Sequence, residues 1–509
     1  MITDLLDDKL IKQAQTILKK KCNLKNQQIN LKKKDFFFSI KDMSIDISRN
    51  ILNKEIILDL SKFAKQSKIR NSIKDLFDNN YKSPTENKKV SFLFERNNKE
   101  LMTKKQKKLF NLHDKIKAQP QQRLTRKPIK NLIHIGIGGS ILGMQAISHA
   151  LKDFHDKKLK IYYVSSPDLS DIQDALNECN LSETAFIFAS KSFSTREVLL
   201  NYIYVKGLLS SFLDDKYDIA DHFYAITANK SLAVSKGFKS SNILTFSNAI
   251  PGRFSLSSEV SLCLLLELGK KNYSNFIKGI YFMDNHFRKN KIEENIPIIM
   301  ALLTIWNTNY LNINNNCVSG YSYRLRSMFN FIQQIEMESN GKSVSIMNQK
   351  LHYDTSPFMF GLQGTESQHS FFQMIHQGTH RLSLDFIGVI NTKHSKESDR
   401  FILSNLIAQA NLCYEGKTKK QIYENINGGN PSNIILLDSI TPFNIGLLTA
   451  MYENKVVAEG LLWNINSFDQ WGVEEGKKLS SSLMNELGSK KKTRSSSYLL
   501  NHIKRKIKK

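Results

Sequence analysis

The sequence predicts an α/β protein with two α/β domains in tandem and helical extensions at both ends. Two stretches, about 130–250 and about 316–465, alternate short apolar runs with segments of helical periodicity. A glycine-rich turn joins the first apolar run, residues 132–135, to a helix. Because alternating strands and helices of this length form parallel sheets covered on both faces, each domain is predicted to be a mainly parallel sheet flanked by helices, an αβα sandwich.

The N-terminal part is predicted to be helical. Residues 1 to about 34 are expected to form an amphipathic, lysine-rich lead-in, and apolar spacing predicts two helices within residues 45–80. Residues 83–96 are expected to turn at Pro84 and end in a strand, and residues 119–127 form a basic link. The chain thus divides into a helical region packing on the core (1–120), a first α/β domain (121–290), a second (291–480) and a basic helical tail (481–509).

The elements of the two domains follow from the same patterns. Strands of the first are expected at residues 132–137, 160–165, 184–189, 222–227 and 243–246, and helices at 143–154, 169–176, 195–213 and 230–237. A helical bridge is expected at 255–268 and 297–310. Strands of the second domain are expected at 318–321, 357–361, 383–389 and 433–437, with C-terminal helices at 453–462 and 473–487. Ligands of such sheets bind in the loops that follow the strands.

Composition narrows the class of protein. The net charge of +26 would suit a nucleic-acid binder, but the lysines are dispersed, which favours a solvated surface that attracts anionic metabolites. No apolar run approaches the 18 residues typical of a membrane span, and no secretory signal is recognised at the start. The five cysteines are scattered, which predicts reduced thiols in the cytoplasm and no zinc site. We expect neither nucleic acid nor membrane as a partner.

The glycine-rich turn is the first candidate for ligand binding. Gly136, Gly138, Gly139 and Ser140 lie between a strand and a helix, where backbone N–H groups can meet an anion. The turn lacks the last glycine of the dinucleotide fingerprint, since Ile141 stands there, and it lacks the Gly-Lys-Ser/Thr of a P-loop. A phosphate cradle and an ordinary tight turn therefore both stay open.

A second loop follows the strand at 184–189. It contains Ser190, Lys191, Ser192, Phe193, Ser194 and Thr195, and a helix is expected to follow. A serine or threonine that caps a helix needs one hydroxyl, whereas four hydroxyls and a lysine suit a phosphate dianion. The ribose-binding candidate Asp168 is not at a strand tip, so a sugar phosphate is favoured over a nucleotide.

Acid–base candidates lie in the second domain. Gln334 and Glu338 share one face of a helix predicted at 324–339. Glu338, desolvated by Ile335 and Met337, would be a base, although a solvent-facing glutamate is the commoner explanation. His369 near a helix start would be an acid or base, or a histidine satisfied within the core.

Three further residues are candidates, and a metal site is not expected. Arg253, on a turn predicted to be exposed, would face an oxyanion or solvent. Gln470 and Lys477 lie two helical turns apart, and Gly476 leaves room for a ligand beside Lys477. His369 and His376 lack the carboxylate spacing of a metal site, so we expect no metal.

Taken together, these segments resemble the phosphoglucose isomerase (glucose-6-phosphate isomerase) family. The resemblance covers roughly residues 35–480 and rests on motifs in the family's order: IGIGGSILG, SKSFSTREV, PGRFSLSSEVSL, QQIEMESNGK, GTESQHSFFQMIHQGTH, NPSNIILLDSITPFNIGLLTAMYE and WNINSFDQWGVEEGK. It implies two sugar-isomerase-type domains, a homodimer, and interconversion of glucose 6-phosphate and fructose 6-phosphate in glycolysis and gluconeogenesis. It implies no cofactor.

The resemblance also implies roles for matching residues. Glu338 matches the base that moves a proton between C1 and C2 through a cis-enediol(ate). His369 matches the ring-opening group, which the other subunit contributes, and Lys477 the lysine that assists it. Arg253 matches the arginine that stabilises the enediolate. The substrate-binding positions are Gly139, Ser140, Ser190, Lys191, Ser192, Phe193, Ser194, Thr195, Gln334 and Gln470.

The chain departs from the family pattern at several positions, and other functions stay open. Ile141, Pro251 and the pair Leu362-Gln363 replace residues common in the family, which puts substrate contacts and rate in doubt rather than the reaction. A catalytically silent sugar-phosphate sensor is the first alternative, but it would not need Glu338 and His369. A nucleic-acid binder is the second.

Overall fold

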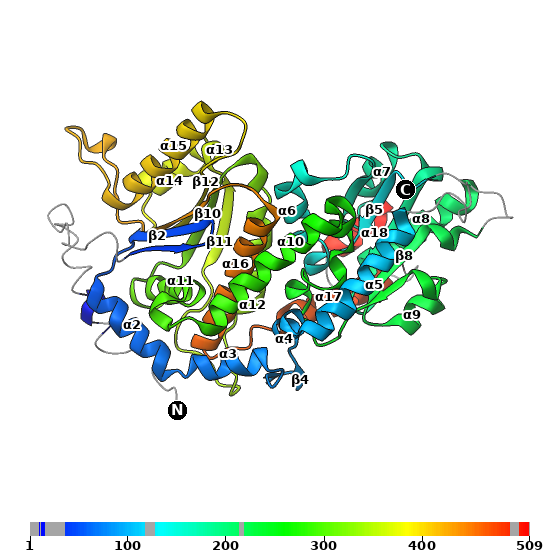
Figure 1. The fold of residues 1–509 in the computed structure, drawn as a ribbon, viewed down its shortest axis with the longest axis horizontal. Coiled ribbons are helices and arrows are strands. Elements are labelled where there is room, and N and C mark those ends of the chain that lie inside the picture. Colours follow the sequence, from blue (N-terminus) through cyan, green and yellow to red (C-terminus); the bar gives the residue numbers. More distant parts are fainter. Residues whose placement is uncertain are drawn as a thin grey trace. The chain divides into compact units, whose positions relative to one another are not determined.

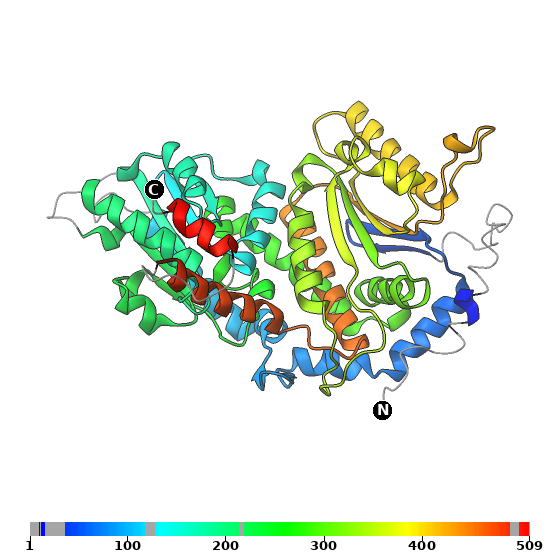
Figure 2. The same ribbon diagram turned by 180° about the vertical axis from the view of Figure 1, so that it is seen from behind.

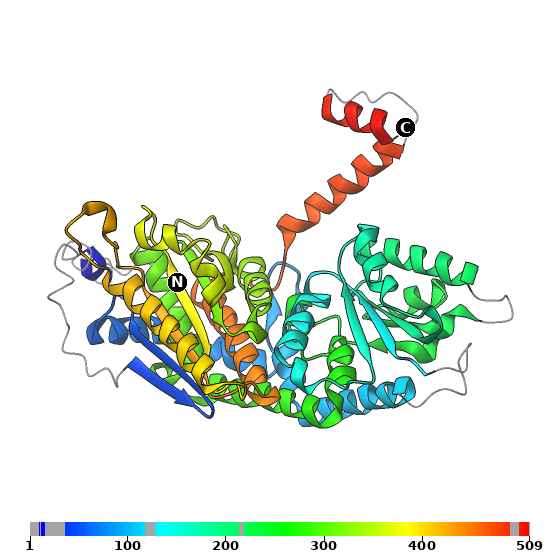
Figure 3. The same cartoon turned by 90° about the horizontal axis from the view of Figure 1, so that it is seen from above.

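The computed structural model describes Leu10 and residues 12–15, 36–117, 128–212, 218–488 and 498–507. The chain forms two compact units, Met1–Ser467 and Phe468–Lys509. The first unit contains both large sheets, and the second contains α17 (Trp471–Gly488) and α18 (Tyr498–Ile507), at the red end of the colour scale in Figure 3. Most of the predicted lead-in at 1–34 and the link at 119–127 lie outside the described residues. The division into four segments stays a prediction.

The first sheet has five parallel strands in the order β6-β5-β7-β8-β9 (Figure 1). The strands are β5 (Asn131–Ile135), β6 (Lys160–Val164), β7 (Thr184–Ala189), β8 (Phe223–Thr227) and β9 (Ile243–Thr245), and the helices between them are α6 (Leu142–Ala150), α7 (Leu169–Asn177), α8 (Arg196–Phe212) and α9 (Lys230–Ser235). Every residue of β5, β7 and β8 is buried, so both faces are covered. All five predicted strands are confirmed.

The second sheet has six strands in the order β1-β2-β13-β12-β10-β11 (Figure 2). The strands are β1 (Phe37–Ile40), β2 (Met43–Arg49), β10 (Asn315–Tyr321), β11 (Phe358–Gln363), β12 (Ser383–Val389) and β13 (Ser432–Leu437). The last four are parallel and correspond to the four predicted strands. Two α/β sheets, each mainly parallel, are thus confirmed.

The prediction of helix from residue 45 is wrong at its start. Met43, Ile45 and Ile47 are buried and alternate with partly exposed residues, which is the period of a strand. That strand pairs antiparallel with β13, where Ile45 lies opposite Ile435. The partner is almost 400 residues away in the sequence, so no local pattern could indicate it. The two predicted helices follow as α2 (Lys54–Gln66) and α3 (Ile69–Phe77).

The strand expected at the end of residues 83–96 is also wrong. After a short hairpin of β3 (Lys82–Ser83) and β4 (Lys88–Lys89), the chain forms α4 (Phe92–Asn97) and then α5 (Lys99–Lys117). Phe92, Leu93 and Arg96 lie on the buried side of α4, and the Arg96 guanidinium forms buried ion pairs with Asp284 and Glu453. The buried face of this helix is not recognised in the sequence, because Arg96 counts there as a polar residue.

Long buried helices occupy the centre of the first unit. They are α10 (Leu262–Lys289), which bends at Gly269, α11 (Ile296–Ile305), which ends in a π-helical turn, and α16 (Pro442–Leu462). At the crossing of α10 and α16 a Cβ on Gly279 would lie 2.0 Å from the carbonyl oxygen of Phe443. The two helices can approach so closely only because this position is glycine.

Four further helices lie between the strands of the second sheet in the sequence. They are α12 (Met328–Asn340), α13 (Gly364–Gln368), α14 (Phe372–Gln377) and α15 (Lys396–Glu415). α12 packs against α6 of the first domain and against α16. None of the described helices is long and apolar enough to cross a membrane.

A buried charge cluster joins α12 to α16. The Lys455 ammonium lies 2.8 Å from the Glu336 carboxylate and 2.5 Å from that of Glu459, and all three residues are buried. Burial disfavours the charged lysine, but the two carboxylates outweigh it and raise the pKa of Lys455. Burial, and next the Glu336 carboxylate, raise the pKa of Glu459 far above its ordinary value. The ion pairs of Lys455 therefore join α16 to the turn of α12 that precedes Glu338.

Candidate active site

Glu338 lies in the last turn of α12, between an amide and a guanidinium. Gln334 Nε2 donates to Glu338 Oε2 at 3.0 Å, which confirms that both residues share one face of the helix. The other carboxylate oxygen, Oε1, lies 3.2 Å from Nη1 of Arg253. The Glu338 side chain keeps 27% of its surface exposed, so a ligand can reach it.

The predicted surroundings of Glu338 need correction. Ile335 and Glu336 are the fully buried residues, and they face the core and Lys455. Positions two apart on a helix point to nearly opposite sides, so Glu338 faces away from that cluster. The carboxylate of Glu338 is therefore held by polar neighbours rather than desolvated by Ile335.

Arg253 is buried, in contrast to the exposed turn that was predicted. Its side chain is 1% exposed, and it joins three segments of the chain. Nε donates to Ser339 Oγ and Nη2 to the carbonyl oxygen of Ser467, each at 2.6 Å, while Nη1 reaches Glu338. The guanidinium is therefore a fixed positive charge beside the carboxylate.

The glycine-rich turn covers the Arg253 turn. Residues Gly138–Ser140 form a single 3-10 turn after β5, and a Cβ on Gly139 would lie 2.3 Å from the carbonyl oxygen of Gly252. Gly138 has φ of 56°, and a Cβ there would lie 3.1 Å from Gln334 Nε2. The glycines thus allow two backbone segments to approach each other, with Gly138 next to Gln334 and Gly139 next to Gly252 and Arg253.

A hydrogen bond joins the serine-rich loop to the segment that precedes Arg253. Lys191 Nζ donates to the carbonyl oxygen of Ile250 at 2.9 Å. Within the loop the hydroxyls pair, Ser190 with Thr195 and Ser192 with Ser194, each at 2.8 Å. The left-handed residue Phe193 (φ of 55°) turns its ring into the core.

The charge of Lys191 is sensitive to its surroundings. Burial lowers the pKa of Lys191 to about 8. The Glu86 carboxylate opposes this shift, whereas the positive charges of Lys88 and Arg253 add to it. Near neutral pH the lysine is therefore cationic, beside four hydroxyls at the start of α8, and the group suits a phosphate dianion.

His369 lies at the end of α13, and its side chain is exposed. The interpretation as a core histidine is wrong. In the described part of the chain its imidazole makes no hydrogen bond, and no contact joins it to Glu338 or Arg253. His376, which was considered with His369 as a metal ligand, forms a hydrogen bond of 2.7 Å between its Nε2 atom and Gln409 Oε1. Among the described residues no group of three or more His, Cys, Asp or Glu side chains is arranged to hold a metal ion.

Gln470 and Lys477 belong to the second compact unit. Gln470 directly precedes α17, and Lys477 lies in its second turn. The Lys477 ammonium forms a 2.8 Å ion pair with Glu474 on the same helix, with both side chains exposed. A Cβ on Gly476 would meet nothing within 4 Å, in agreement with the open space expected beside Lys477.

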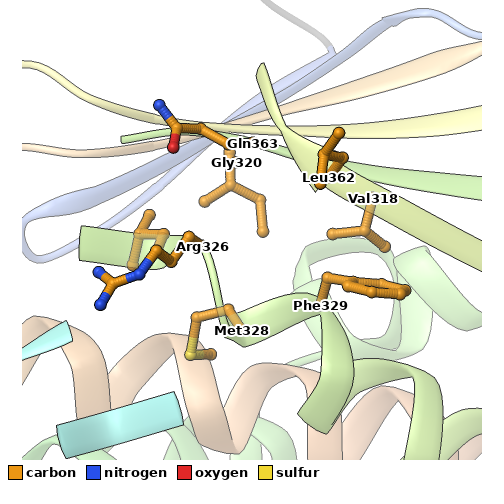
Figure 4. Close-up of a pocket in the computed structure, with 9 residues that line it drawn as sticks. Val318, Gly320, Arg326, Met328, Phe329, Leu362 and Gln363 are labelled. Atoms are coloured by element: carbon orange, nitrogen blue, oxygen red, sulfur yellow. The ribbon is translucent and has the colours of Figure 1, made fainter. Parts of the chain in front are cut away.

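A small internal cavity lies near the carboxyl ends of β10 and β11 (Figure 4). Its lining consists of Val318, Gly320, Leu325, Arg326, Met328, Phe329, Leu362, Gln363 and Ile387. Its volume of about 10 Å³ holds at most one water molecule, so it is no sugar site. Two open grooves of about 670 and 590 Å³ contain none of the predicted site residues.

Sequence reasoning missed Ser339, Ser467 and Ile250. Ser339 follows Glu338 directly and could have been considered from that position. Ser467 and Ile250 act through main-chain carbonyl oxygens, which every residue type offers. No sequence signal exists for such a role.

Comparison with known proteins shows the family to which the chain belongs. A sequence profile described as phosphoglucose isomerase matches residues 46–499. The chain belongs to the phosphoglucose isomerase family. A protein named glucose-6-phosphate isomerase from Campylobacter jejuni subsp. doylei is 36% identical over 506 residues, 92% of this chain and 91% of that protein. One of the same name from Helicobacter pylori (strain J99) is 35% identical over 484 residues, 89% of each.

A solved structure has the same fold. The crystal structure of a glucose-6-phosphate isomerase from Chlamydia trachomatis superposes with a TM-score of 0.83, covering 100% of this chain and 99% of that one at 24% identity. In this member of the phosphoglucose isomerase family the two sheets and the helices between them therefore form the fold expected from the motifs.

The close contact between Gly139 and Gly252 predicts that any side chain at position 139 lowers the stability of the fold. In Gly139→Ala the Cβ would overlap backbone atoms that cannot rotate away, so the two turns must separate. We expect the free energy of unfolding to fall by about 1–3 kcal/mol in urea denaturation. Gly207→Ala is the control, because nothing lies within 4 Å of that site in α8, and alanine there should stabilise by up to about 1 kcal/mol. Equal stability of the two variants would contradict the close contact.

Proposed function

We propose that the chain is an aldose–ketose isomerase that interconverts D-glucose 6-phosphate and D-fructose 6-phosphate, in glycolysis and gluconeogenesis. The observation that carries the proposal is the Glu338 carboxylate, partly open to solvent and held between the Gln334 amide and the Arg253 guanidinium. Moving a proton between neighbouring carbons needs one base that reaches both, and a cation beside the oxygen where negative charge develops. Glu338 is the base and Arg253 the cation.

The remaining residues divide between binding and ring opening. The loop from Ser190 to Thr195 with Lys191 holds the phosphate, and Gly139 and Ser140 hold the sugar. Gln334 Oε1 is buried and has no hydrogen-bond partner in the described structure, so it accepts from a sugar hydroxyl. Gln470 contacts the substrate, and Lys477 assists opening of the pyranose ring.

His369 opens the ring from the other subunit of a homodimer in this proposal. Its exposed imidazole has no hydrogen-bond partner within the described chain, as expected of a side chain that acts in a neighbouring subunit's site. A C2 dimer would then carry two equivalent sites, each built from both chains. We place the enzyme in the cytoplasm, which suits the four described cysteines, all of them free thiols.

The reaction itself is tested with purified protein. Fructose 6-phosphate is supplied, and glucose 6-phosphate is followed with a coupled dehydrogenase. Turnover that depends on the chain supports the isomerase. Binding of fructose 6-phosphate without turnover by folded protein would overturn it in favour of a sugar-phosphate sensor.

Replacing the base should stop the chemistry but spare binding. Glu338→Gln keeps the shape of the side chain and removes the proton acceptor, so kcat should fall by roughly 10²–10⁴-fold. The dissociation constant for fructose 6-phosphate, measured by calorimetry, should stay within about threefold. Glu178→Gln, at an exposed position after α7, is the matched control and should leave kcat unchanged. Activity of Glu338→Gln within about tenfold of wild type would contradict the assignment.

Lys191 predicts an alkaline limit of activity. Below pH 8 its ammonium attracts the phosphate dianion, and above pH 8 the neutral amine does not, so kcat/KM should fall as pH rises through about 8. Lys191→Arg stays charged, so the alkaline limb, the fall of kcat/KM near pH 8, should be absent from the pH profile of this variant. Lys206→Met, on α8, serves as control and should keep it. A limb that persists at the same pH in Lys191→Arg would show that another group causes it.

Mixed dimers test the role of His369. Chains carrying Glu338→Gln and chains carrying His369→Ala are each expected to have low activity on their own. When the two are co-expressed and assemble at random, half of the dimers contain both chains, and one of the two sites in each is intact. We expect recovery of about a quarter of wild-type activity. Absence of recovery in dimers verified by sedimentation would place His369 in its own chain's site.

A further inference from the structure

A buried histidine connects the glycine-rich turn to helix α10. His134 lies in the middle of β5 and is 0% exposed. Its Nε2 atom is 2.8 Å from the carbonyl oxygen of Ser140, the last residue of the turn. Its Nδ1 atom is 3.0 Å from Sγ of Cys263, the second residue of α10, which is also 0% exposed.

The chemistry of these atoms determines where the protons are. A carbonyl oxygen can only accept, so Nε2 of His134 carries the hydrogen and donates to Ser140. Burial lowers the pKa of His134 to about 4, so the ring is neutral near pH 7. A neutral imidazole with hydrogen on Nε2 has an acceptor at Nδ1, and the Cys263 thiol donates to it.

The turn is shaped to receive this bond. Gly136 lies between His134 and the turn, and a Cβ there would be 2.9 Å from the Ser140 carbonyl oxygen and 3.3 Å from His134 Nε2. The absence of a side chain lets the turn fold back onto the histidine. On its other side the turn contacts Gln334 through Gly138 and Gly252 through Gly139. His134 therefore holds the glycine-rich turn from its buried side, and the other side of the turn contacts residues of the candidate site.

We propose that His134 and Cys263 are positioning residues for substrate binding: the Cys263 thiol donates to Nδ1 and holds the imidazole ring, and His134 then fixes Ser140 and the glycine-rich turn in the orientation that receives the sugar phosphate. The inference rests on the proposed function, because it takes the turn as part of the sugar site. Neither side chain touches the substrate. If the thiol is removed, the buried Nδ1 acceptor loses its donor, and the ring is no longer held against the Ser140 carbonyl.

Kinetic constants test the proposal. His134→Phe keeps a ring but removes the donor, and Cys263→Ala removes the hydrogen bond that holds the ring. Both should raise KM for fructose 6-phosphate by roughly 5–100-fold, as expected when a buried carbonyl loses its donor, with kcat changed less than about threefold. Cys263→Ser keeps a donor and should restore KM. Cys413→Ala, at an equally buried cysteine of the second domain, is the control and should leave KM unchanged.

A spectroscopic measurement separates this inference from the proposed function. Nitrogen NMR of the full chain should show His134 with an unprotonated Nδ1 and a protonated Nε2, and Cys263→Ala should shift the Nδ1 resonance, because that atom loses its donor. Unchanged KM in Cys263→Ala and His134→Phe, with normal wild-type turnover, would overturn the inference, as would a protonated Nδ1. If His134→Phe does not fold, the comparison of KM between Cys263→Ala and Cys263→Ser tests the inference. Absence of wild-type turnover would overturn the proposed function, and the NMR result would still stand.

Discussion

The buried guanidinium of Arg253 is the interaction on which the candidate site depends. It binds Ser339 and Glu338 on α12 and the carbonyl oxygen of Ser467, at the end of the first compact unit. A buried cation is costly unless its donors are satisfied, so these segments must stay together for the charge to be tolerated. The carboxylate that we assign to proton transfer therefore has a fixed neighbour of opposite charge before any substrate arrives.

Close approach of backbones is the second constraint, and it explains the glycines. The Arg253 turn is held on one side by the turn at Gly139, where no Cβ fits, and on the other by Lys191, bound to Ile250. In the sequence the glycine-rich turn resembles an anion cradle. In the fold its glycines are required because segments of the same chain pack closely against it. In the proposed sugar site the turn contributes Gly139 and Ser140, and His134 holds the carbonyl of Ser140.

Much of the fold could be predicted from local pattern. The nine strands expected in the two sheets all exist, because buried parallel strands are short apolar runs bounded by turns and helices. Prediction failed where the decisive contact is distant or polar: β2 pairs with β13, and α4 owes its buried face to Arg96. At the candidate site, the roles of the residues stay predictions, and the exposure of Arg253, Glu338 and His369 was not predicted correctly, because exposure depends on what packs against each residue.

The sequence by itself determined the class of fold, the family and the identity of the candidate residues, since motifs and periodicity are properties of neighbouring positions. Only the tertiary structure decided which of them meet. It brings Gln334, Glu338 and Arg253 together. It buries Glu336, two residues before Glu338, beside Lys455, and it joins His134 to Ser140 and Cys263. Helical periodicity predicts the Gln334–Glu338 pair. The other contacts of Arg253, Lys455 and Cys263 link residues up to 214 positions apart, as between Arg253 and Ser467, and some involve main-chain atoms that every residue shares, so no local pattern can encode them.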